Sequence, residues 1–406
     1  MTRQRQDITQ YALVTAAYWG FTLTDGALRM LVLLHFHTLG YSPLQLASLF
    51  LLYEIFGVVT NIIGGWLGSR VGLNKTLILG LMLQVIAVMA LSFLGADWSL
   101  SLAVPFVVAV QGLSGIAKDL TKMSAKSSLK LIVPEGQSST LFKWVALLTG
   151  SKNTLKGIGF FLGGVMLSLM GFTAALWAMA GLLILIIIPA LIFLTPALGK
   201  SPQKTRFREI LSKSRSINLL SAARFFLFGA RDIWFVVALP LFLYENIGLS
   251  FAQVGGLMAL WVICYGCVQS AAPMIIKKSP DGRSREVAEN KRWIFALALI
   301  PFGIAVALRS GLSPDYSLLV GLSIFGIIFA LNSALHSYLI LAFTHNDHVA
   351  TTVGFYYSAN AGGRLAGTLL SGLIYQYGGL AACLTGSGVM LVFAFILSLF
   401  IPARET

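Results

Sequence analysis

Long apolar runs recur from one end of the chain to the other, separated by short polar or glycine-containing stretches. A helix needs about 20 mainly apolar residues to cross the hydrocarbon core of a bilayer. The pattern predicts twelve such helices, at 11–38, 44–68, 76–95, 101–122, 138–169, 172–195, 217–244, 251–276, 292–310, 315–343, 349–377 and 379–402. We therefore expect an all-α membrane protein whose first apolar run is a spanning helix and not a cleaved signal peptide.

Composition supports a lipid-facing surface. The 406 residues are 57% hydrophobic and 11% charged, whereas a soluble domain carries about 25% charged residues. The net charge of +14 would suit a nucleic-acid-binding protein, but the Lys and Arg residues are spread over loops, helix ends and a few helix interiors. Since no basic domain gathers them, we expect the bilayer as a partner and no nucleic acid.

The distribution of Lys and Arg predicts the topology. Alternate connections carry nearly all of the loop cations, and the connections between them, 35–42, 95–99, 171–173, 245–250 and 377–380, are almost free of positive charge. The positive side of such loops is cytoplasmic, so both termini are expected in the cytoplasm. A basic stretch divides the chain into an N-terminal six-helix bundle (1–195), a cytoplasmic linker (196–216) and a C-terminal six-helix bundle (217–406).

The two halves resemble each other at a constant offset of 208 residues. This offset places Gly40, Ser42, Gln45 and Leu49 on Gly248, Ser250, Gln253 and Leu257, places Gly159, Gly164 and Gly171 on Gly367, Gly372 and Gly379, and places Lys156 on Arg364. Two parallel six-helix repeats describe the major facilitator architecture, which binds its substrate near the middle of the bilayer. We therefore expect a major facilitator fold with two pseudo-repeats.

A loop between the second and third predicted helices agrees with this architecture. Its sequence is GWLGSRVGLNK, residues 65–75, and it resembles the facilitator loop that helps to hold the two halves together. The resemblance implies a conformational-gate role for Gly65, Gly68, Arg70, Gly72 and Lys75. Ser69 stands where the family has an acid, and Asn74 where it has a base, which puts the charge latch in doubt but not the fold.

Charged residues inside predicted helices suggest a binding site. Each costs about 2.5–3.5 kcal/mol at the centre of a spanning helix. The deep cations are Arg29, Lys118, Lys152, Lys156, Arg231 and Arg364, and the deep acids are Asp25, Glu54, Asp119 and Asp232. Lys152 and Lys156 carry the same charge on one helix face, which is unfavourable by itself. An anionic substrate would offset the excess of cations.

The predicted substrate-binding residues are therefore Arg29, Lys118, Lys122, Lys152, Lys156, Arg231 and Arg364. The four deep acids are candidates for proton coupling or for orienting these bases. Structural explanations stay open for several residues. Asp25 and Arg29 are four residues apart and can pair along one helix, and Glu54 can be a structural hydrogen-bonding group. Lys122, Lys126 and Lys130 can form a solvated helix end, Arg224 can reach the interface, and Asn332 and His336 can be core hydrogen-bonding groups.

Several stretches resemble one particular family. Residues 23–30, 114–128, 149–153 and 228–234 are similar to the ArsJ-type organoarsenical efflux permeases, and the resemblance covers nearly the whole chain. It implies export of 1-arseno-3-phosphoglycerate from the cytosol of a bacterium through its inner membrane, which confers arsenate resistance. A glyceraldehyde-3-phosphate dehydrogenase would supply this ester. We expect a monomer, and no residue roles are carried over from the family.

Two other classes of function compete. A carrier of phosphate esters or other organic anions, unrelated to arsenic, would use the same cations. A membrane-embedded enzyme or sensor is the remote alternative, because the sequence shows no nucleophile–base motif and no metal-spaced histidines. Cys264, Cys267 and Cys383 are too few and too scattered for a metal site or for soft sulfur ligation of trivalent arsenic. We therefore expect no enzyme activity, no cofactor and no metal.

Overall fold

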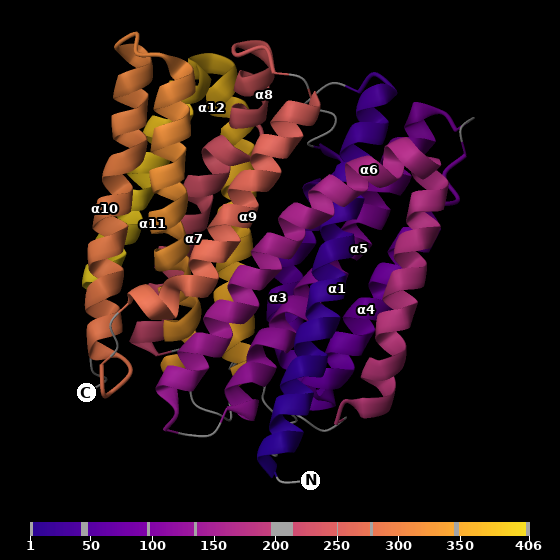
Figure 1. The fold of residues 1–406 in the computed structure, drawn as a ribbon, viewed down its shortest axis with the longest axis vertical. Coiled ribbons are helices and arrows are strands. Elements are labelled where there is room, and N and C mark those ends of the chain that lie inside the picture. Colours follow the sequence, from indigo (N-terminus) through magenta and orange to yellow (C-terminus); the bar gives the residue numbers. More distant parts are fainter. Residues whose placement is uncertain are drawn as a thin grey trace. The chain divides into compact units, whose positions relative to one another are not determined.

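The computed structural model describes residues 3–41, 48–95, 98–133, 136–195, 214–249, 251–276, 279–344 and 349–402. The described residues form helices joined by short turns and contain no strand (Figure 1). The helices are α1 (Arg3–Thr38), α3 (Leu51–Val71), α4 (Leu73–Leu91), α5 (Leu100–Ile132), α6 (Ser138–Phe193), α7 (Arg215–Phe235), α8 (Ala238–Glu245), α9 (Phe251–Ile275), α10 (Ser284–Arg309), α11 (Pro314–Ala342) and α12 (Val349–Leu399).

These elements account for the twelve predicted spans. The two longest helices each contain one residue with non-helical backbone angles, Gly171 in α6 and Gly379 in α12, and each therefore supplies two spans. α7 and α8 together supply one span, and the other helices supply one each. Many large apolar side chains on these helices stay exposed, among them Phe161, Leu169 and Met274. A surface of this kind fits lipid better than water, and the prediction of an all-α membrane protein is confirmed.

The repeat is visible in the backbone. Gly40, which follows α1, has φ +85°, and Gly248, which follows α8, has φ +81°. Gly171 and Gly379 have φ +75° and +65°. Both pairs are related by the offset of 208 residues. Positive φ is costly for residues with a side chain, so the sequence keeps glycine at equivalent chain reversals in both halves.

One predicted helix is interrupted. The span expected at 217–244 breaks at residues 236–237, between α7 and α8. Pro240 explains the position of the break, because a proline ring clashes with the carbonyl four residues earlier and lacks a backbone N–H. The Ser371 hydroxyl of α12 accepts the backbone N–H of Ala238 at 3.2 Å, which satisfies a donor at the start of α8.

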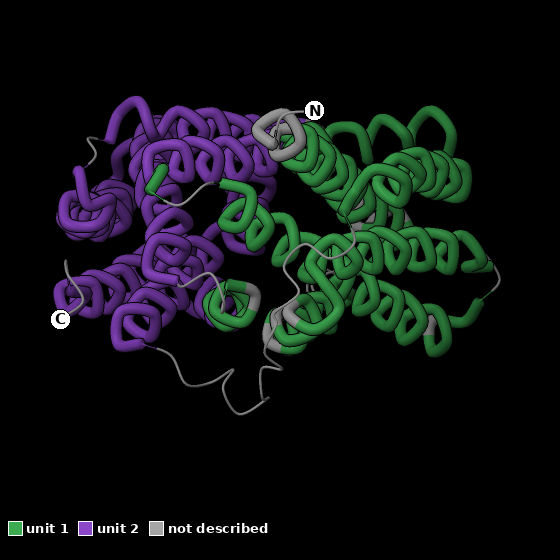
Figure 2. Tube along the Cα trace, turned by 90° about the horizontal axis from the view of Figure 1, so that it is seen from below, with its two compact units in different colours: residues 1–137, 155–212, 345–358 green, residues 138–154, 213–344, 359–406 purple. Residues whose placement is uncertain are grey.

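The chain folds into two compact units (Figure 2). Unit 1 comprises residues 1–137, 155–212 and 345–358, and unit 2 comprises residues 138–154, 213–344 and 359–406. The first turns of α6 therefore belong to unit 2, and the first turns of α12 belong to unit 1. The offset of 208 residues relates these two segments, so the two repeats each contribute the start of one long helix to the other unit. Most of the predicted linker 196–216 lies outside the described residues, and the division there stays a prediction.

Glycines allow close helix crossings inside each unit. In unit 1, a Cβ added to Gly159 or Gly163 of α6 would collide with backbone carbonyls of α1. In unit 2, a Cβ added to Gly367 of α12 would lie 2.5 Å from the carbonyl oxygen of Gly229 in α7. Small residues let helix backbones approach closely in lipid. The second crossing also brings two charged side chains together, as described below.

Candidate substrate and coupling sites

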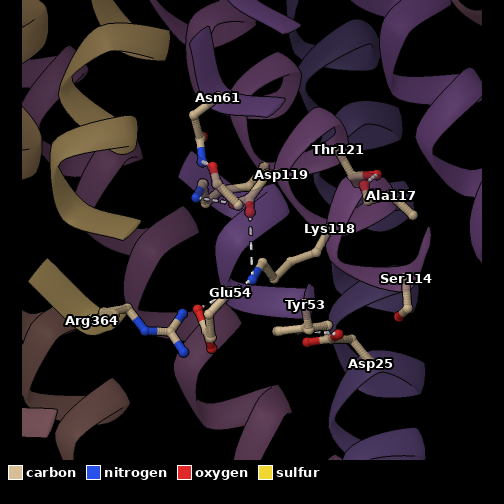
Figure 3. A network of polar contacts seen from close by, with 12 residues as sticks. Asp25, Tyr53, Glu54, Asn61, Ser114, Ala117, Lys118, Asp119, Thr121 and Arg364 are labelled. Carbon is tan, nitrogen blue, oxygen red and sulfur yellow. Dashed lines mark hydrogen bonds and ion pairs between the residues drawn. The ribbon is translucent and has the colours of Figure 1, made fainter. Parts of the chain in front are cut away.

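In unit 1, the charged residues of α1 bind partners on α3 and not each other. Arg29 Nη2 lies 3.3 Å from Glu54 Oε1, and the guanidinium lies 5.0 and 5.2 Å from the ring centres of Phe50 and Tyr53. The Tyr53 hydroxyl donates to Asp25 Oδ1 at 2.6 Å (Figure 3). The pairing of Asp25 with Arg29 along the helix, which the sequence left open, is not what the structure shows.

α5 adds two cations and a carboxylate to this network. Lys118 Nζ lies 3.9 Å from Glu54 Oε2 and 3.4 Å from Asp119 Oδ2, so it sits between the two acids (Figure 3). Lys118 Nζ also lies 3.7 Å from the ring centre of Tyr53. Lys122 forms an ion pair with the other oxygen of Asp119. Glu54 and Asp119 are therefore each shared by two cations.

The next turn of α5 binds the segment of α12 that belongs to unit 1. Lys126 Nζ donates to the Tyr357 hydroxyl at 2.5 Å, and the ammonium groups of Lys122 and Lys126 lie 4.7 and 4.8 Å from the Tyr357 ring centre. Lys122 and Lys126 are buried, and Lys130 is partly buried. A solvated helix end is therefore the wrong description for the first two lysines.

In unit 2, two arginines share one carboxylate. Arg231 Nε donates to Asp232 Oδ1 at 2.7 Å, and Arg364 Nε donates to Asp232 Oδ2 at 3.2 Å. The Asp232 side chain is fully buried, whereas the two arginine side chains are 17% and 16% exposed. A guanidinium has five N–H donors in a planar fork, so an arginine that donates to Asp232 through Nε can bind a further group as well. The carboxylate fixes the orientation of both forks.

Arg224 is a buried cation that the sequence did not single out as a site residue. It lies 2% exposed in α7 and donates from Nε to Asn360 Oδ1 at 2.9 Å and from Nη1 to the Ser333 hydroxyl at 3.2 Å. Its guanidinium also lies 3.8 Å from the ring centre of Phe228. Arg224 precedes Arg231 by seven residues, which places both on one helix face. This spacing of seven residues is the feature of the sequence that could have identified Arg224 as a site residue.

A chain of side-chain amides leads to Arg224 from α6. Asn153 Nδ2 donates to Gln269 Oε1 at 2.5 Å, and Gln269 Nε2 donates to the Ser333 hydroxyl at 3.1 Å. The residue before Asn153 is the predicted site residue Lys152, which is partly buried and also belongs to unit 2. Lys156, one turn later, belongs to unit 1, and its Nζ lies 5.6 Å from the ring centre of Phe160.

The predicted gate loop joins α3 to α4. Gly72 has φ +107°, and its N–H donates to the carbonyl of Gly68 at 3.0 Å. Arg70 packs 4.4 Å from the ring centre of Trp66. Asn74, which stands where the family has a base, donates from Nδ2 to the Thr195 carbonyl at 2.8 Å. This hydrogen bond connects the loop to the end of α6. Lys75 is exposed, and Gly65 lies within α3.

The charges of the two networks have a common arrangement. Among the described residues, five cations share three carboxylates through the ion pairs given above. Asp25 is the fourth deep acid, and in the described part of the chain it is hydrogen-bonded to Tyr53 but has no ion pair. Within the described ranges, no group of three or more His, Cys, Asp or Glu side chains is arranged to hold a metal ion.

Comparisons with known proteins agree with the fold. The sequence matches the family model of the Major Facilitator Superfamily over residues 12–288, which is more than half of the chain. A comparison with curated proteins finds no match. The fold is shared with the human organic anion transporter MFSD10 (TETRAN), which is 18% identical with a TM-score of 0.75, over 98% of this chain and 100% of that one.

Two further solved structures show the same fold with other cargoes. A bacterial homologue of the iron transporter ferroportin, in an outward-facing state, is 12% identical with a TM-score of 0.75 and covers 97% of this chain and 100% of its own. The E. coli fucose:proton symporter FucP is 13% identical with a TM-score of 0.74, over 99% of this chain and 100% of that one. These identities relate the folds and do not identify a cargo.

Proposed function

Because the chain belongs to the Major Facilitator Superfamily and is a multi-pass membrane carrier, we propose that it exports an organic oxyanion by alternating access. The observation that carries this proposal is the sharing of three buried carboxylates by five cations. Three carboxylates can orient five cations but cannot balance all of their positive charge. An anionic cargo would supply the remaining negative charge. The match to a family of carriers also confirms the expectation that the protein is not an enzyme.

Oxygen-rich anions fit these cations best. Arginine binds phosphate-like and carboxylate groups through two parallel N–H bonds, whereas lysine acts as a point charge. Arg231 and Arg364 both bind Asp232, and Arg29, Lys118 and Lys122 surround Glu54 and Asp119. Cations on several helices favour a cargo with more than one negative charge.

We take the cargo to be 1-arseno-3-phosphoglycerate, on the resemblance of residues 23–30, 114–128, 149–153 and 228–234 to organoarsenical permeases. Its arsenate ester, phosphate and three-carbon backbone are compatible with arginine and lysine ligands. The cell would then need a glyceraldehyde-3-phosphate dehydrogenase to make the ester, and the carrier would sit in a bacterial inner membrane with both termini in the cytoplasm. Lys152 and Lys156 complete the set of cations proposed to meet the cargo.

Asp25 is the best candidate for exchanging a coupled proton. Protonation of Glu54, Asp119 or Asp232 would remove a charge that two cations share. Protonation of Asp25 breaks no ion pair within the described residues, because its contact there is the Tyr53 hydroxyl. A proton can therefore enter or leave at Asp25 while the cation network keeps its geometry, and the other three acids orient the bases.

Direct transport tests the cargo. Everted membrane vesicles receive 1-arseno-3-phosphoglycerate made in the assay by glyceraldehyde-3-phosphate dehydrogenase from radiolabelled glyceraldehyde 3-phosphate, NAD and arsenate. We expect uptake of this ester and little uptake of free arsenate. Uptake of 3-phosphoglycerate at the same rate, together with unchanged arsenate sensitivity of cells that lack the carrier, would instead identify a phosphate-ester carrier unrelated to arsenic.

A further inference from the structure

α1 carries a polar stripe, and the contacts described so far explain only its last two members. Along this helix, polar side chains recur every three or four residues, at Tyr11, Thr15, Tyr18, Thr22, Asp25 and Arg29. At 100° per residue these six positions fall within an arc of about 80° on one face of the helix. Neighbouring positions off the stripe, such as Ala12, Ala16 and Trp19, are apolar and exposed.

The stripe is inside the protein and consists of hydroxyl groups up to Asp25. Thr15, Tyr18, Thr22 and Asp25 are 5%, 2%, 2% and 5% exposed. A threonine in a helix commonly returns its hydroxyl to a backbone carbonyl, and Thr22 does so, donating to the Tyr18 carbonyl at 2.7 Å. In the described part of the chain, the Tyr18 hydroxyl has no hydrogen-bond partner, whereas the Thr15 hydroxyl interacts with the Tyr11 hydroxyl one turn earlier.

The Tyr18 hydroxyl is a buried polar group without a partner in the described residues. A buried polar atom without a partner costs free energy, and native structures contain few of them. Threonine, tyrosine and water each donate and accept hydrogen bonds. The Cβ atoms of successive positions on one helix face are about 5–6 Å apart, and a water molecule can bridge two polar side chains that do not meet directly. A row of such groups therefore suits the relay of protons.

The stripe ends at the carboxylate that the proposed function makes the coupling group. The side chains that face this region come from four helices: Arg29 on α1, Tyr53 and Glu54 on α3, Lys118, Asp119 and Lys122 on α5, and Tyr357 on α12. The cations among them are held by Glu54, Asp119 and the Tyr357 ring. Asp25 is thus the acid at which a relayed proton can stop without breaking an ion pair.

We propose that the hydroxyl stripe Tyr11–Thr15–Tyr18–Thr22 of α1 conducts protons between the Arg3 end of the helix and Asp25. This inference rests on the proposed function, which couples export to protons at Asp25. Each hydroxyl accepts a proton on one side and passes its own to the next water or hydroxyl, so no group gains a lasting charge before the proton reaches the carboxylate. At Thr22 this step requires the O–H to turn away from the Tyr18 carbonyl that now accepts it. The stripe carries the proton, and the cargo binds elsewhere.

The test compares two transport modes in everted vesicles of the full-length protein. The first mode is uptake of the arsenical ester driven by an acid vesicle interior, and the second is exchange of internal for external ester with no proton gradient. Tyr18→Phe removes one hydroxyl and keeps the ring. We expect gradient-driven uptake to fall at least about tenfold, a modest share of what a positioned proton-transfer group contributes, and exchange to stay unchanged.

Thr15→Val is a second variant on the stripe and should give the same split between the two modes. Thr24→Val is the matched control, since its hydroxyl is off the stripe and donates to the Phe21 carbonyl at 2.9 Å. It should preserve both modes. Thermal unfolding of the purified variants checks that Tyr18→Phe folds normally, as expected for a hydroxyl with no partner in the described structure.

The outcomes separate the inference from the proposed function. If the unaltered carrier takes up ester without regard to the gradient, proton coupling itself is wrong. If the unaltered carrier is coupled and both Tyr18→Phe and Thr15→Val stay coupled, the stripe is not the path and the proposed function stands. If the two variants lose exchange as much as gradient-driven uptake, the stripe contacts the cargo, and the inference is overturned.

Discussion

At the scale of single residues, Arg364 offers the most direct test of the cation set. Arg364→Ala leaves Asp232 with Arg231 alone and removes a donor fork. Truncation of a buried charge pair costs about 2–5 kcal/mol, so we expect a loss of export of about 30-fold or more in everted vesicles. Arg364→Lys should recover little, because lysine lacks the planar fork.

Membrane insertion has to be intact for this result to count. Fluorescence-detected gel filtration of the tagged variants measures it. Arg292→Ala is the control, because the Arg292 side chain is 77% exposed and pairs with Glu289 on the surface, where an ion pair contributes little. We expect the same loss of export for Lys152→Ala. Full arsenate resistance from both Lys152→Ala and Arg364→Ala would place the cargo site elsewhere.

At the scale of helices, the crossing of α7 and α12 should depend on Gly367. A Cβ at this position would lie 2.5 Å from the Gly229 carbonyl oxygen and 2.9 Å from the Asp232 Cβ. Since both are held by a helix backbone, Gly367→Ala should force the helices apart and cost about 1–3 kcal/mol. Thermal unfolding in detergent, followed by tryptophan fluorescence, should show a lower Tm and a loss of export.

Gly372→Ala on the same helix is the matched control. A Cβ at Gly372 meets no atom within 4 Å, and alanine is a better helix former than glycine by about 0.5–1 kcal/mol. Its Tm should be unchanged or higher. Equal destabilisation by both substitutions would mean that the close crossing at Gly367 does not set the stability of this region.

The helices and the repeat could be predicted from the sequence because both follow from local patterns. Apolar run length gave the twelve spans, and the pairs Gly40/Gly248 and Gly171/Gly379 marked equivalent chain reversals. The break between α7 and α8 was missed. Its signal, Pro240, is ambiguous because Pro105, Pro189, Pro273 and Pro301 all lie within continuous helices.

Partner choice in the charge networks could not be predicted in the same way. Spacing along α1 allowed Asp25 to pair with Arg29, but helix packing brings α3 close enough for Glu54 to bind Arg29 and for Tyr53 to bind Asp25. The burial of Lys126 and Arg224 likewise depends on α12 and α11, which are distant in the sequence. These partners are set by tertiary contacts between helices, which a short stretch of sequence does not contain.

At the scale of the whole molecule, an even number of spans puts both termini on one side of the membrane. The Lys and Arg bias of the loops predicts that this side is the cytoplasm. A fluorescent protein fused after Thr406 should therefore fluoresce in cells, and alkaline phosphatase fused there should be inactive. Alkaline phosphatase inserted after Gly248, in a connection on the opposite side, should be active. The reverse pattern would invert the topology.

The charge of the cargo sets a pH dependence that the protein's own cations do not. A phosphate monoester loses its second negative charge below its second pKa of about 6, whereas arginine and lysine stay cationic there. Binding of 3-phosphoglycerate to the purified carrier should therefore weaken as the pH falls from about 7 to about 5. One unit charge 4 Å from a cation is worth up to about 4 kcal/mol near a protein surface, so a loss of at least about tenfold is expected.

Isothermal titration calorimetry measures this affinity without any gradient, so it reports binding of the ligand and not its transport. Glycerate is the control ligand, because it keeps the carboxylate of 3-phosphoglycerate and lacks its phosphate. Its affinity should be weak and nearly constant over the same range of pH, since its single charge does not change. If glycerate bound as tightly as 3-phosphoglycerate, the cations would recognise one carboxylate only, and a cargo with two anionic ends would have no basis in the charge arrangement.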